Sequence, residues 1–412
     1  MPQSTRTFVI VGASLAGAKA AETLRTEGFD GRVVLIGDEA RRPYERPPLS
    51  KEYLRAEKDF DAAAVHPADF YDDNGIELRT ATLATAIDPA GRSVTLAAGE
   101  QIAYDALLLA TGSAPRRLPV PGGGLPGVLY LRSVEDADAL RHAIGPSAQL
   151  VVIGAGWIGA EVAASARQLG ASVAMVELAA VPLERVLGPE VGAVYRDLHA
   201  AHGVDLHLGA GVEAIVGSEA VDAVRLSDGT VLPATAVVVG VGVTPRVELA
   251  DAAGLTVDNG IVVDEHLRTS APGVYAAGDV ANAFHPRYGA RIRLEHWSAA
   301  LNQGPAAARA MLGGDVVYDR TPYFFSDQYD LGMEYRGWAP GFEQVVFRGD
   351  PAGREFLCFW LRQGRVAAAM NANIWDAGDA LEALVRADRP VDPVLLADPD
   401  VDLAGLAGPP GP

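Results

Sequence analysis

The stretch that decides the fold is residues 149–177, QLVVIGAGWIGAEVAASARQLGASVAMVE. An apolar run at its start leads into Gly154, Gly156 and Gly159, which have the spacing GxGxxG. A segment of helical pattern follows as far as Leu169, and a second apolar run ends at Glu177. Strand, glycine turn, helix and strand form a Rossmann-type unit, whose turn lets a pyrophosphate approach the positive end of the helix. The stretch therefore predicts a dinucleotide-binding fold.

A second copy of this layout lies about 140 residues earlier, in FVIVGASLAG at residues 8–17. Here Ser14 replaces the middle glycine, and the pattern predicts a helix from Leu15 to Glu27 and a strand from Arg32 to Ile36. Serine is small enough to keep the turn open and adds a hydroxyl group. Two such units in one chain predict two bound nucleotides, or one binding unit and one decayed copy. The residues expected to line the turns are Gly12, Ser14, Ala16 and Gly17 in the first unit, and Gly154, Gly156, Trp157, Ile158 and Gly159 in the second.

Each unit also offers an acidic residue about 20 positions beyond its turn, where a carboxylate can accept hydrogen bonds from ribose hydroxyls. In the first unit this residue is Asp38 or Glu39, and in the second it is Glu177. No Arg or Lys lies between Glu177 and Arg185, so the usual clamp for a 2′-phosphate is missing. We therefore expect the second unit to bind NADH rather than NADPH.

Two further strand ends belong with these units. Thr111 and Gly112 follow the apolar run LLLA, and Gly278 and Asp279 follow VYAA. We expect Asp279 to stand at the start of a helix, where its carboxylate can hydrogen-bond a ribityl chain.

Composition excludes several classes of protein. The chain of 412 residues carries 53 acidic against 34 basic residues, a net charge of −19, which argues against proteins that wrap DNA or lie on anionic membranes. Cys358 is the only cysteine, so a disulfide framework, an iron–sulfur cluster and a CxxC pair are excluded. The eight histidines show no metal-ligand spacing, and we expect no metal site. With no apolar stretch long enough to span a bilayer, we expect a soluble, cytoplasmic protein.

Several motifs beyond the turns carry a resemblance to a known family. They are the segment from Arg46 to Lys51, RPPLSK, the stretch GVGVTP at 240–245, and the stretch EHW at 295–297 with NQG at 302–304. With them, the chain resembles the FAD-dependent pyridine-nucleotide–disulfide oxidoreductase superfamily over about residues 7 to 390. More closely, it is similar to the ferredoxin reductases that serve bacterial cytochromes P450 and aromatic-ring dioxygenases.

The resemblance implies roles for individual residues. FAD is the implied cofactor and NADH the electron donor, with Lys51, Glu161 and Trp297 at the reacting rings. Glu161 is expected to approach the nicotinamide and to pair with Lys51. The residues implied to bind FAD or NADH, in addition to those of the turns, are Asp38, Arg46, Lys51, Thr111, Gly112, Arg132, Glu161, Glu177, Gly242, Gly278, Asp279 and Trp297.

The resulting fold class is α/β, with two Rossmann-like three-layer nucleotide-binding domains and a C-terminal α+β domain with an antiparallel sheet. Aromatic residues concentrate after Tyr323, which marks the change of domain. The predicted boundaries are 1–115 and 246–321 for the FAD domain, 116–245 for the NAD domain, 322–400 for the C-terminal domain, and 401–412 for a disordered tail.

The predicted reaction is hydride transfer from NADH to FAD, followed by transfer of single electrons to a [2Fe-2S] ferredoxin that feeds a cytochrome P450 or a ring-hydroxylating dioxygenase. Because Cys358 is alone and late in the chain, a disulfide reductase is excluded. A rubredoxin- or quinone-type NADH reductase stays open, as does a redox-gated interaction protein of the apoptosis-inducing-factor type.

Ferredoxins of this kind are usually acidic, so docking on a chain of charge −19 requires a local basic patch. The sequence offers Arg287, Arg291 and Arg293, while Arg336 of the C-terminal domain is an alternative. We expect no nucleic-acid or membrane partner, and a monomer or weak homodimer.

Overall fold

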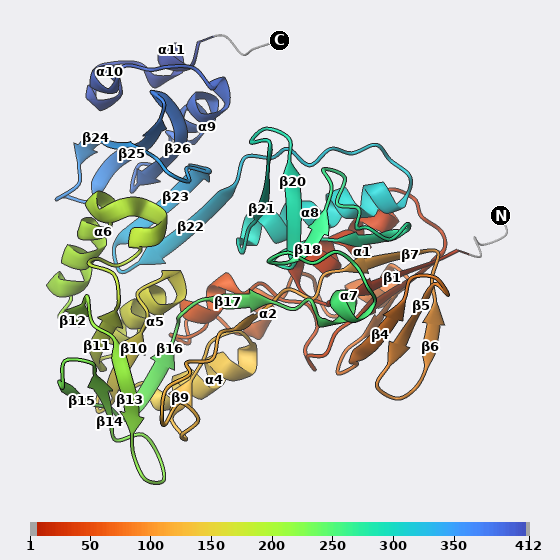
Figure 1. Ribbon diagram of the computed structural model, residues 1–412, viewed down its shortest axis with the longest axis horizontal. Helices are drawn as coiled ribbons and strands as arrows, with labels where there is room; N and C mark the ends of the chain where they lie inside the picture. The colour runs from red at the N-terminus through yellow and green to blue at the C-terminus, as the bar shows by residue number, and fades with distance from the viewer. Residues whose placement is uncertain (1–5, 409–412) are drawn as a thin grey trace. The chain divides into compact units, whose positions relative to one another are not determined.

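A computed structural model describes residues 6–408, which form two compact units. Neither unit is continuous in the chain. The first contains residues 6–46, 59–114 and 243–320, and the second contains residues 47–58, 115–242 and 321–408. In Figure 1 the first unit therefore combines red and orange segments with green and cyan ones, while the second combines yellow and green segments with blue ones.

The first unit is built on a parallel sheet of five strands, in the order β19-β7-β1-β2-β3. The three central strands β7, β1 and β2 are almost wholly buried, which explains their continuous apolar sequences. Helices α1 (Leu15–Thr26) and α8 (Trp297–Met311) pack closely because Gly304 has no side chain. A Cβ at Gly304 would lie only 2.2 Å from the Ala16 carbonyl oxygen. The sheet strands are β1 (Thr7–Val11), β2 (Arg32–Ile36), β3 (Ile76–Arg79), β7 (Ala106–Leu109) and β19 (Val274–Ala276).

Smaller elements complete the first unit. An antiparallel sheet of three strands lies between residues 84 and 103, and a mixed three-stranded sheet lies between residues 261 and 293. These elements are β4 (Ala84–Asp88), β5 (Ser93–Leu96), β6 (Gln101–Ala103), β18 (Ile261–Val263), β20 (Ala281–His285), β21 (Ala290–Arg293), α2 (Phe60–Ala63), α3 (Phe70–Asp73) and α7 (Glu248–Ala252); β8 (Ser113–Pro115) pairs with β17 (Val243–Pro245).

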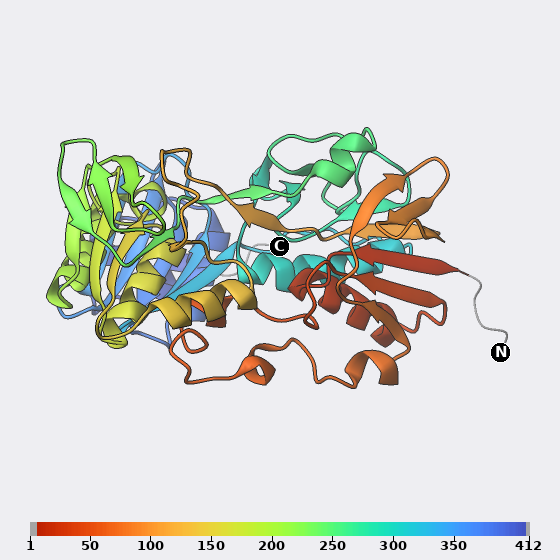
Figure 2. The same ribbon diagram turned by 90° about the horizontal axis from the view of Figure 1, so that it is seen from below.

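The second unit repeats the parallel sheet, in the order β12-β11-β10-β16-β9, with α5 packed against it. Figure 2 shows the yellow strands and helices of this repeat. An antiparallel sheet, β13-β14-β15, again follows the Rossmann unit. The elements are β9 (Val128–Leu129), α4 (Val134–Ala143), β10 (Gln149–Ile153), α5 (Trp157–Gln168), β11 (Ser172–Glu177), α6 (Glu184–Ala201), β12 (Asp205–Leu208), β13 (Val212–Val216), β14 (Ala223–Leu226), β15 (Val231–Pro233) and β16 (Ala236–Val239).

The C-terminal region of the second unit is an antiparallel sheet in the order β22-β23-β26-β25-β24. Residues of α6 share one apolar core with this sheet, and the buried Trp360 indole donates a hydrogen bond of 2.9 Å to the Leu187 carbonyl oxygen. Helices α9, α10 and α11 supply a second core cluster with β24, β25 and β26. The elements are β22 (Tyr323–Gln328), β23 (Leu331–Gly337), β24 (Gln344–Asp350), β25 (Glu355–Arg362), β26 (Arg365–Ala372), α9 (Gly378–Ala387), α10 (Pro393–Ala397) and α11 (Leu403–Ala407).

The predicted fold class is confirmed, but three details differ. Residues 116–242 and 321–408 form one compact unit because α6 and the C-terminal sheet share a core, and the segment 47–58 belongs to that unit as well. Residues 403–407 of the predicted disordered tail form α11, which Asp402 caps and whose Leu403 and Ala407 are buried; residues 409–412 lie outside the described part of the chain. Asp279 begins no helix, because a turn at Gly278 leads directly into β20.

Candidate dinucleotide and redox sites

The first glycine turn connects β1 to α1 and leaves no room for a side chain at Gly12 or at Gly17. Gly12 has φ +121°, and a Cβ there would lie 2.0 Å from the Ala110 carbonyl oxygen. A Cβ at Gly17 would lie 2.0 Å from the Gly12 carbonyl oxygen. Ser14 is the N-cap of α1, yet its side chain makes no capping hydrogen bond. The turn thus holds the backbone in the tight conformation that a bound pyrophosphate requires.

The second turn differs at its middle position. A Cβ at Gly159 would lie 2.0 Å from the Gly154 carbonyl oxygen, so packing requires that glycine. At Gly156 the nearest atom to a Cβ is the Gly240 carbonyl oxygen at 4.0 Å, and φ is −75°. Neither packing nor backbone geometry therefore requires glycine at position 156. The open space above this residue is the cradle that an approaching pyrophosphate would fill.

The amino ends of the two helices also fit an anionic ligand. The first turns of α1 and α5 contain no acidic residue. By contrast, α4 carries Glu135 and Asp136 in its first turn and has a complete capping box with Ser133. Protein carboxylates therefore complement the positive end of α4, whereas α1 and α5 leave theirs to a ligand.

The acidic residues of the two units are offset by one position. Gly12 and Gly154 donate equivalent hydrogen bonds to the Ile36 and Val176 carbonyl oxygens, so the residue that matches Glu177 is Gly37. A Cβ at Gly37 would lie 2.6 Å from the Ala13 Cβ, which excludes a side chain there. The acid of the first unit is therefore displaced to Asp38.

Glu177 is oriented by the backbone on both sides. One carboxylate oxygen accepts a hydrogen bond of 2.7 Å from the Ala155 amide in the glycine turn, and the other accepts one of 3.0 Å from the Ala179 amide. The side chain remains half-buried at the carboxyl end of β11. This edge of a parallel sheet is where ligands of α/β proteins bind.

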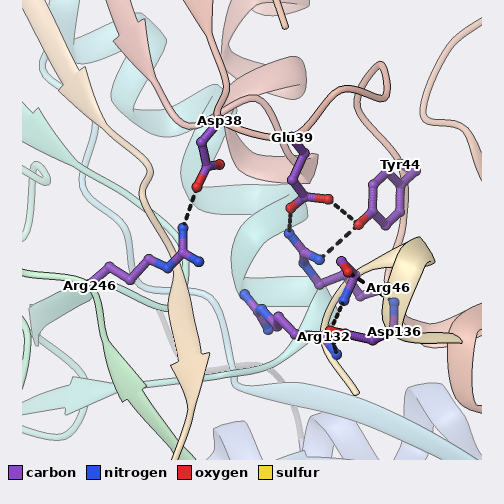
Figure 3. A network of polar contacts seen from close by, with 8 residues as sticks. Asp38, Glu39, Tyr44, Arg46, Arg132, Asp136 and Arg246 are labelled. Carbon is purple, nitrogen blue, oxygen red and sulfur yellow. Dashed lines mark hydrogen bonds and ion pairs between the residues drawn. The ribbon is translucent and has the colours of Figure 1, made fainter. Parts of the chain in front are cut away.

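Arg246 joins three parts of the first unit. Its guanidinium lies 2.8 Å from Asp38 Oδ2, as Figure 3 shows. The Arg246 amide donates to the Gly112 carbonyl oxygen, and the Thr111 hydroxyl donates to the Arg246 carbonyl oxygen at 2.7 Å. Thr111, Gly112 and Asp38, which were predicted separately, are thus brought together. Arg246 stands in no motif of the sequence, and only the fold places it beside Asp38.

A second polar cluster of the first unit surrounds Arg46. Its guanidinium contacts Glu39 at 2.7 Å and the Tyr44 hydroxyl at 3.1 Å, and Tyr44 in turn donates to Glu39 (Figure 3). Burial acts to lower the pKa of Arg46, but Tyr44, Glu39 and Asp279 together raise it above its ordinary value. The Glu39 carboxylate therefore pairs with Arg46, and Asp38 is the more exposed of the two neighbouring carboxylates.

The remaining predicted residues of the first unit lie around the start of α8. Trp297 is the first residue of α8. Burial raises the pKa of the Glu45 carboxyl above its ordinary value, and the neighbouring Trp297 and Lys19 partly offset that shift. Burial lowers the pKa of the neighbouring His296 to about 4, although Asp279 opposes the shift. The Gly278 amide donates a hydrogen bond of 2.8 Å to Gln303 of α8.

Glu161 is the centre of a buried polar site in the second unit. Its Oε2 lies 2.7 Å from Lys51 Nζ and 2.5 Å from Ser50 Oγ, while its Oε1 accepts a hydrogen bond of 2.7 Å from Ser326 Oγ. Lys51 and Glu161 are both nearly inaccessible to solvent, with side-chain exposures of 5% and 8%. The predicted ion pair is confirmed. Ser50 and Ser326 were not predicted, although Ser50 lies within the RPPLSK segment.

Residues 6–304 match the model of the pyridine nucleotide-disulphide oxidoreductase family, and residues 323–407 match the reductase C-terminal model. The chain belongs to the pyridine nucleotide-disulphide oxidoreductase family. Its single cysteine, Cys358, is fully buried in β25, so this member of the family has no redox-active disulfide.

Relatives within the family resemble almost the whole chain. The ferredoxin reductase subunit of the 5,5′-dehydrodivanillate O-demethylase of Sphingobium sp. is 42% identical over 402 residues, which cover 97% of each chain. The ferredoxin–NAD(+) reductase component of the anthranilate 1,2-dioxygenase system of Burkholderia cepacia is 41% identical and covers 96% of this chain and 98% of that one. The putidaredoxin reductase in a covalent complex with putidaredoxin has a TM-score of 0.94 and 39% identity, covering 98% of both chains.

The other predicted residues of this oxidoreductase lie in the second unit. The Trp157 ring packs against Tyr195 and Phe324, with centroid distances of 6.1 and 5.0 Å. The Arg132 amide donates to Asp136 at the start of α4 (Figure 3). Gly242 has φ +99° and accepts a hydrogen bond from the Arg116 amide. Ile158 lies in the first turn of α5.

The three arginines predicted for docking differ in their surroundings. Arg293 is only 9% exposed in its side chain and pairs with Glu295 at 2.5 Å. Arg291 is exposed and donates from Nη1 to the Val263 carbonyl oxygen at 2.6 Å. Arg287 lies in the turn between β20 and β21. Arg293 is therefore a structural residue, while Arg287 and Arg291 stay candidates for docking.

No helix within residues 6–408 combines the length and apolar character needed to cross a bilayer.

Proposed function

We propose that this protein is an NADH-dependent ferredoxin reductase that contains FAD. The observation that supports the proposal is the presence of two dinucleotide-binding turns in a chain whose single cysteine is buried. Two turns provide for two nucleotides, and the lack of a cysteine pair requires the electrons to leave for an external acceptor. Relatives of about 40% identity over nearly the full chain are ferredoxin reductases by name.

The first unit is assigned to FAD. The cradle formed by Gly12, Ser14, Ala16 and Gly17 would receive the pyrophosphate, and Asp38 would accept hydrogen bonds from the ribose. Arg46, Thr111, Gly112, Gly278, Asp279 and Trp297 line the same unit and would hold the rest of the cofactor. FAD, when bound, supplies a two-electron acceptor that can give up its electrons one at a time.

The second unit is assigned to NADH. Gly154, Gly156, Trp157, Ile158 and Gly159 would hold the pyrophosphate, and Gly242 lies in the neighbouring turn. Glu177 would accept hydrogen bonds from the adenosine 2′- and 3′-hydroxyls, where it repels the additional phosphate of NADPH. Lys51, Arg132 and Glu161 also belong to this unit. Lys51 and Arg132 would contact FAD, and Glu161, paired with Lys51, would approach the nicotinamide ring.

The electron acceptor is assigned as a [2Fe-2S] ferredoxin that serves a cytochrome P450 or a ring-hydroxylating dioxygenase. NADH releases two electrons and one proton, and each ferredoxin accepts one electron, so one NADH reduces two ferredoxins and yields NAD⁺ and H⁺. Arg291 is exposed and Arg287 is partly exposed on the first unit, so both offer positive charge to an acidic partner. This local charge would offset the repulsion from the chain's own net charge of −19.

The test combines cofactor content with acceptor specificity. We expect the purified protein to be yellow, to release one FAD per chain, and to reduce cytochrome c with NADH only after a [2Fe-2S] ferredoxin is added. A colourless protein that stays colourless in excess FAD would overturn the cofactor assignment. Equal turnover with rubredoxin or a small quinone in place of ferredoxin would overturn the acceptor assignment.

A further inference from the structure

A chain of buried polar side chains leads away from Glu161 through the second unit. Ser326 Oγ lies 2.7 Å from Glu161 Oε1, and Gln328 Nε2 lies 3.2 Å from Ser326 Oγ. His199 Nε2 lies 3.0 Å from Gln328 Oε1. The chain ends at the partly exposed Tyr329, whose hydroxyl lies 3.4 Å from His199 Nδ1.

The direction of every hydrogen bond in this chain follows from its two ends. The Glu161 carboxylate can only accept, so Ser326 donates to it and must in turn accept from the Gln328 amide nitrogen. This leaves the Gln328 oxygen as an acceptor, so His199 carries its proton on Nε2. Burial lowers the pKa of His199 to about 4, so the ring is neutral at pH 7 and its Nδ1 accepts from Tyr329. All the donors point towards Glu161.

Three elements far apart in the sequence build this arrangement. Glu161 lies on α5, His199 on α6, and Ser326 and Gln328 on β22. Ser326 and Gln328 are two residues apart and so share one face of the strand. The exposures of Ser326, Gln328 and His199 are 0%, 1% and 0%. Burying three polar side chains costs free energy unless each of them forms hydrogen bonds. Apolar side chains could fill these positions without that cost, so the polar side chains indicate a role other than packing.

We infer that Ser326, Gln328 and His199 are positioning residues that hold the Glu161 carboxylate in a single orientation beside Lys51. The chain occupies Oε1, which leaves Oε2 to Ser50 and Lys51. Without it, the Glu161 side chain can rotate and Lys51 loses its fixed partner. This inference rests on the proposed function, because it assigns the chain a role in presenting Glu161 and Lys51 to the nicotinamide.

The first test separates positioning from general damage. Ser326→Ala should slow single-turnover reduction of the FAD-loaded protein by NADH by about tenfold, because a hydrogen bond to a charged group is lost. The Kd for NAD⁺ should change less than about twofold, since Glu177 and the glycine turn are untouched. In a Glu161→Ala background the same substitution should add almost nothing. An equal further loss in that background would overturn the inference.

A matched pair of substitutions tests the far end of the chain. His199→Gln keeps an amide donor able to reach Gln328, whereas His199→Leu fills the site without any donor. We expect His199→Gln to retain most of the wild-type rate and His199→Leu to lose several-fold, with Tyr329→Phe close to wild type because its hydrogen bond is the longest of the chain. Equal rates for His199→Gln and His199→Leu would overturn the inference.

A readout independent of activity uses the reactivity of Lys51. Lys51 is buried against Glu161, so acetic anhydride should label it slowly in the wild-type protein and several-fold faster in Ser326→Ala, as measured by peptide mass spectrometry. Lys58, whose side chain is 52% exposed, should be labelled equally in both. Unchanged labelling of Lys51 would overturn the inference. If the wild-type protein reduces no ferredoxin, the proposed function fails, but this labelling test still decides whether the chain holds Glu161.

Discussion

Lys51 and Glu161 are 110 positions apart in the sequence, yet their Nζ and Oε2 atoms lie 2.7 Å apart in the interior of the second unit. The segment 47–58 makes this contact possible: the chain leaves the first unit after Arg46, contributes Ser50 and Lys51 to the second, and returns at Asp59. Three other side-chain contacts hold the same segment, since Tyr53 donates to Asp138, Ser165 donates to the Ser50 carbonyl oxygen, and Arg55 donates to Ser165.

The Lys51–Glu161 pair predicts a large effect on stability. Glu161→Ala leaves a buried ammonium group without its partner, and we expect a loss of about 3–5 kcal/mol in the free energy of unfolding. Replacing both residues, as in Lys51→Met with Glu161→Leu, should restore most of that loss because no charge is then buried alone. Urea unfolding followed by circular dichroism measures both values.

The control for this prediction is an exposed ion pair in the same unit. Arg225 and Glu213 lie 3.1 Å apart, with side-chain exposures of 43% and 55%, so Glu213→Ala should cost less than about 1 kcal/mol. Equal losses for Glu161→Ala and Glu213→Ala would show that the Lys51–Glu161 pair is solvated in solution.

The two glycines of the second turn predict opposite outcomes. Gly156→Ala meets no atom nearer than 4.0 Å, so the fold should tolerate it while the Kd for NAD⁺ rises at least about tenfold. Gly159→Ala places a Cβ 2.0 Å from the Gly154 carbonyl oxygen and should lower the Tm as well. Calorimetric binding and thermal unfolding distinguish the two variants. If the Gly156→Ala protein binds NAD⁺ with the wild-type Kd, the pyrophosphate does not bind at this turn.

Glu177 predicts the choice of coenzyme. We expect wild type to prefer NADH over NADPH by more than about tenfold in kcat/KM, because a carboxylate facing a phosphate is a like-charge clash. Glu177→Gln keeps an acceptor for the Ala155 or Ala179 amide but removes the charge, so it should narrow the preference without unfolding the turn. An unchanged preference in this variant would mean that repulsion by Glu177 does not select the coenzyme.

His199 predicts a dependence of stability on pH. Its pKa is about 4 in the folded protein and about 6.5 when unfolded, so between these values the unfolded chain binds more protons. Stability should therefore fall by up to about 3 kcal/mol as the pH falls from 6.5 to 4. His199→Gln should flatten this part of the curve, because the variant has no group that titrates at this position. If stability falls equally with pH in the wild-type and His199→Gln proteins, the pKa of His199 is not lowered in the folded protein.

The repeated strands and glycine turns could be predicted because they are local: Gly12, Gly154 and the apolar runs beside them determine the structure within a few residues. Asp279 was misplaced because the pattern of a strand end followed by an acid is shared by helix caps and by turns that lead into another strand. The offset between Glu177 and Asp38 depends on a clash with Ala13, which no spacing rule contains.

The polar chain beyond Glu161 could not be predicted from the sequence. Its members lie on α5, α6 and β22, and neither Ser326 nor His199 stands in a pattern that differs from an ordinary surface position. Only the shared core of α6 and the C-terminal sheet, with Trp360 bonded to Leu187, brings these elements together. The same core explains why two predicted domains form one compact unit.

The last prediction concerns the ferredoxin surface, where the structure separates the three arginines. Arg293 is buried against Glu295, so Arg293→Glu should lower stability without reporting on docking. The double variant Arg287→Glu with Arg291→Glu reverses charge at the two remaining positions and should slow ferredoxin-dependent turnover several-fold at low salt, while reduction of the flavin by NADH stays unchanged. The difference should shrink as salt is added, since exposed charges are screened over about 8 Å at physiological ionic strength. Arg336→Glu tests the alternative surface on the C-terminal sheet, although Arg336 contacts Glu334 at 2.9 Å and is largely buried. If the double variant behaves like wild type at low salt and only Arg336→Glu slows the ferredoxin step, the partner docks on the second unit instead.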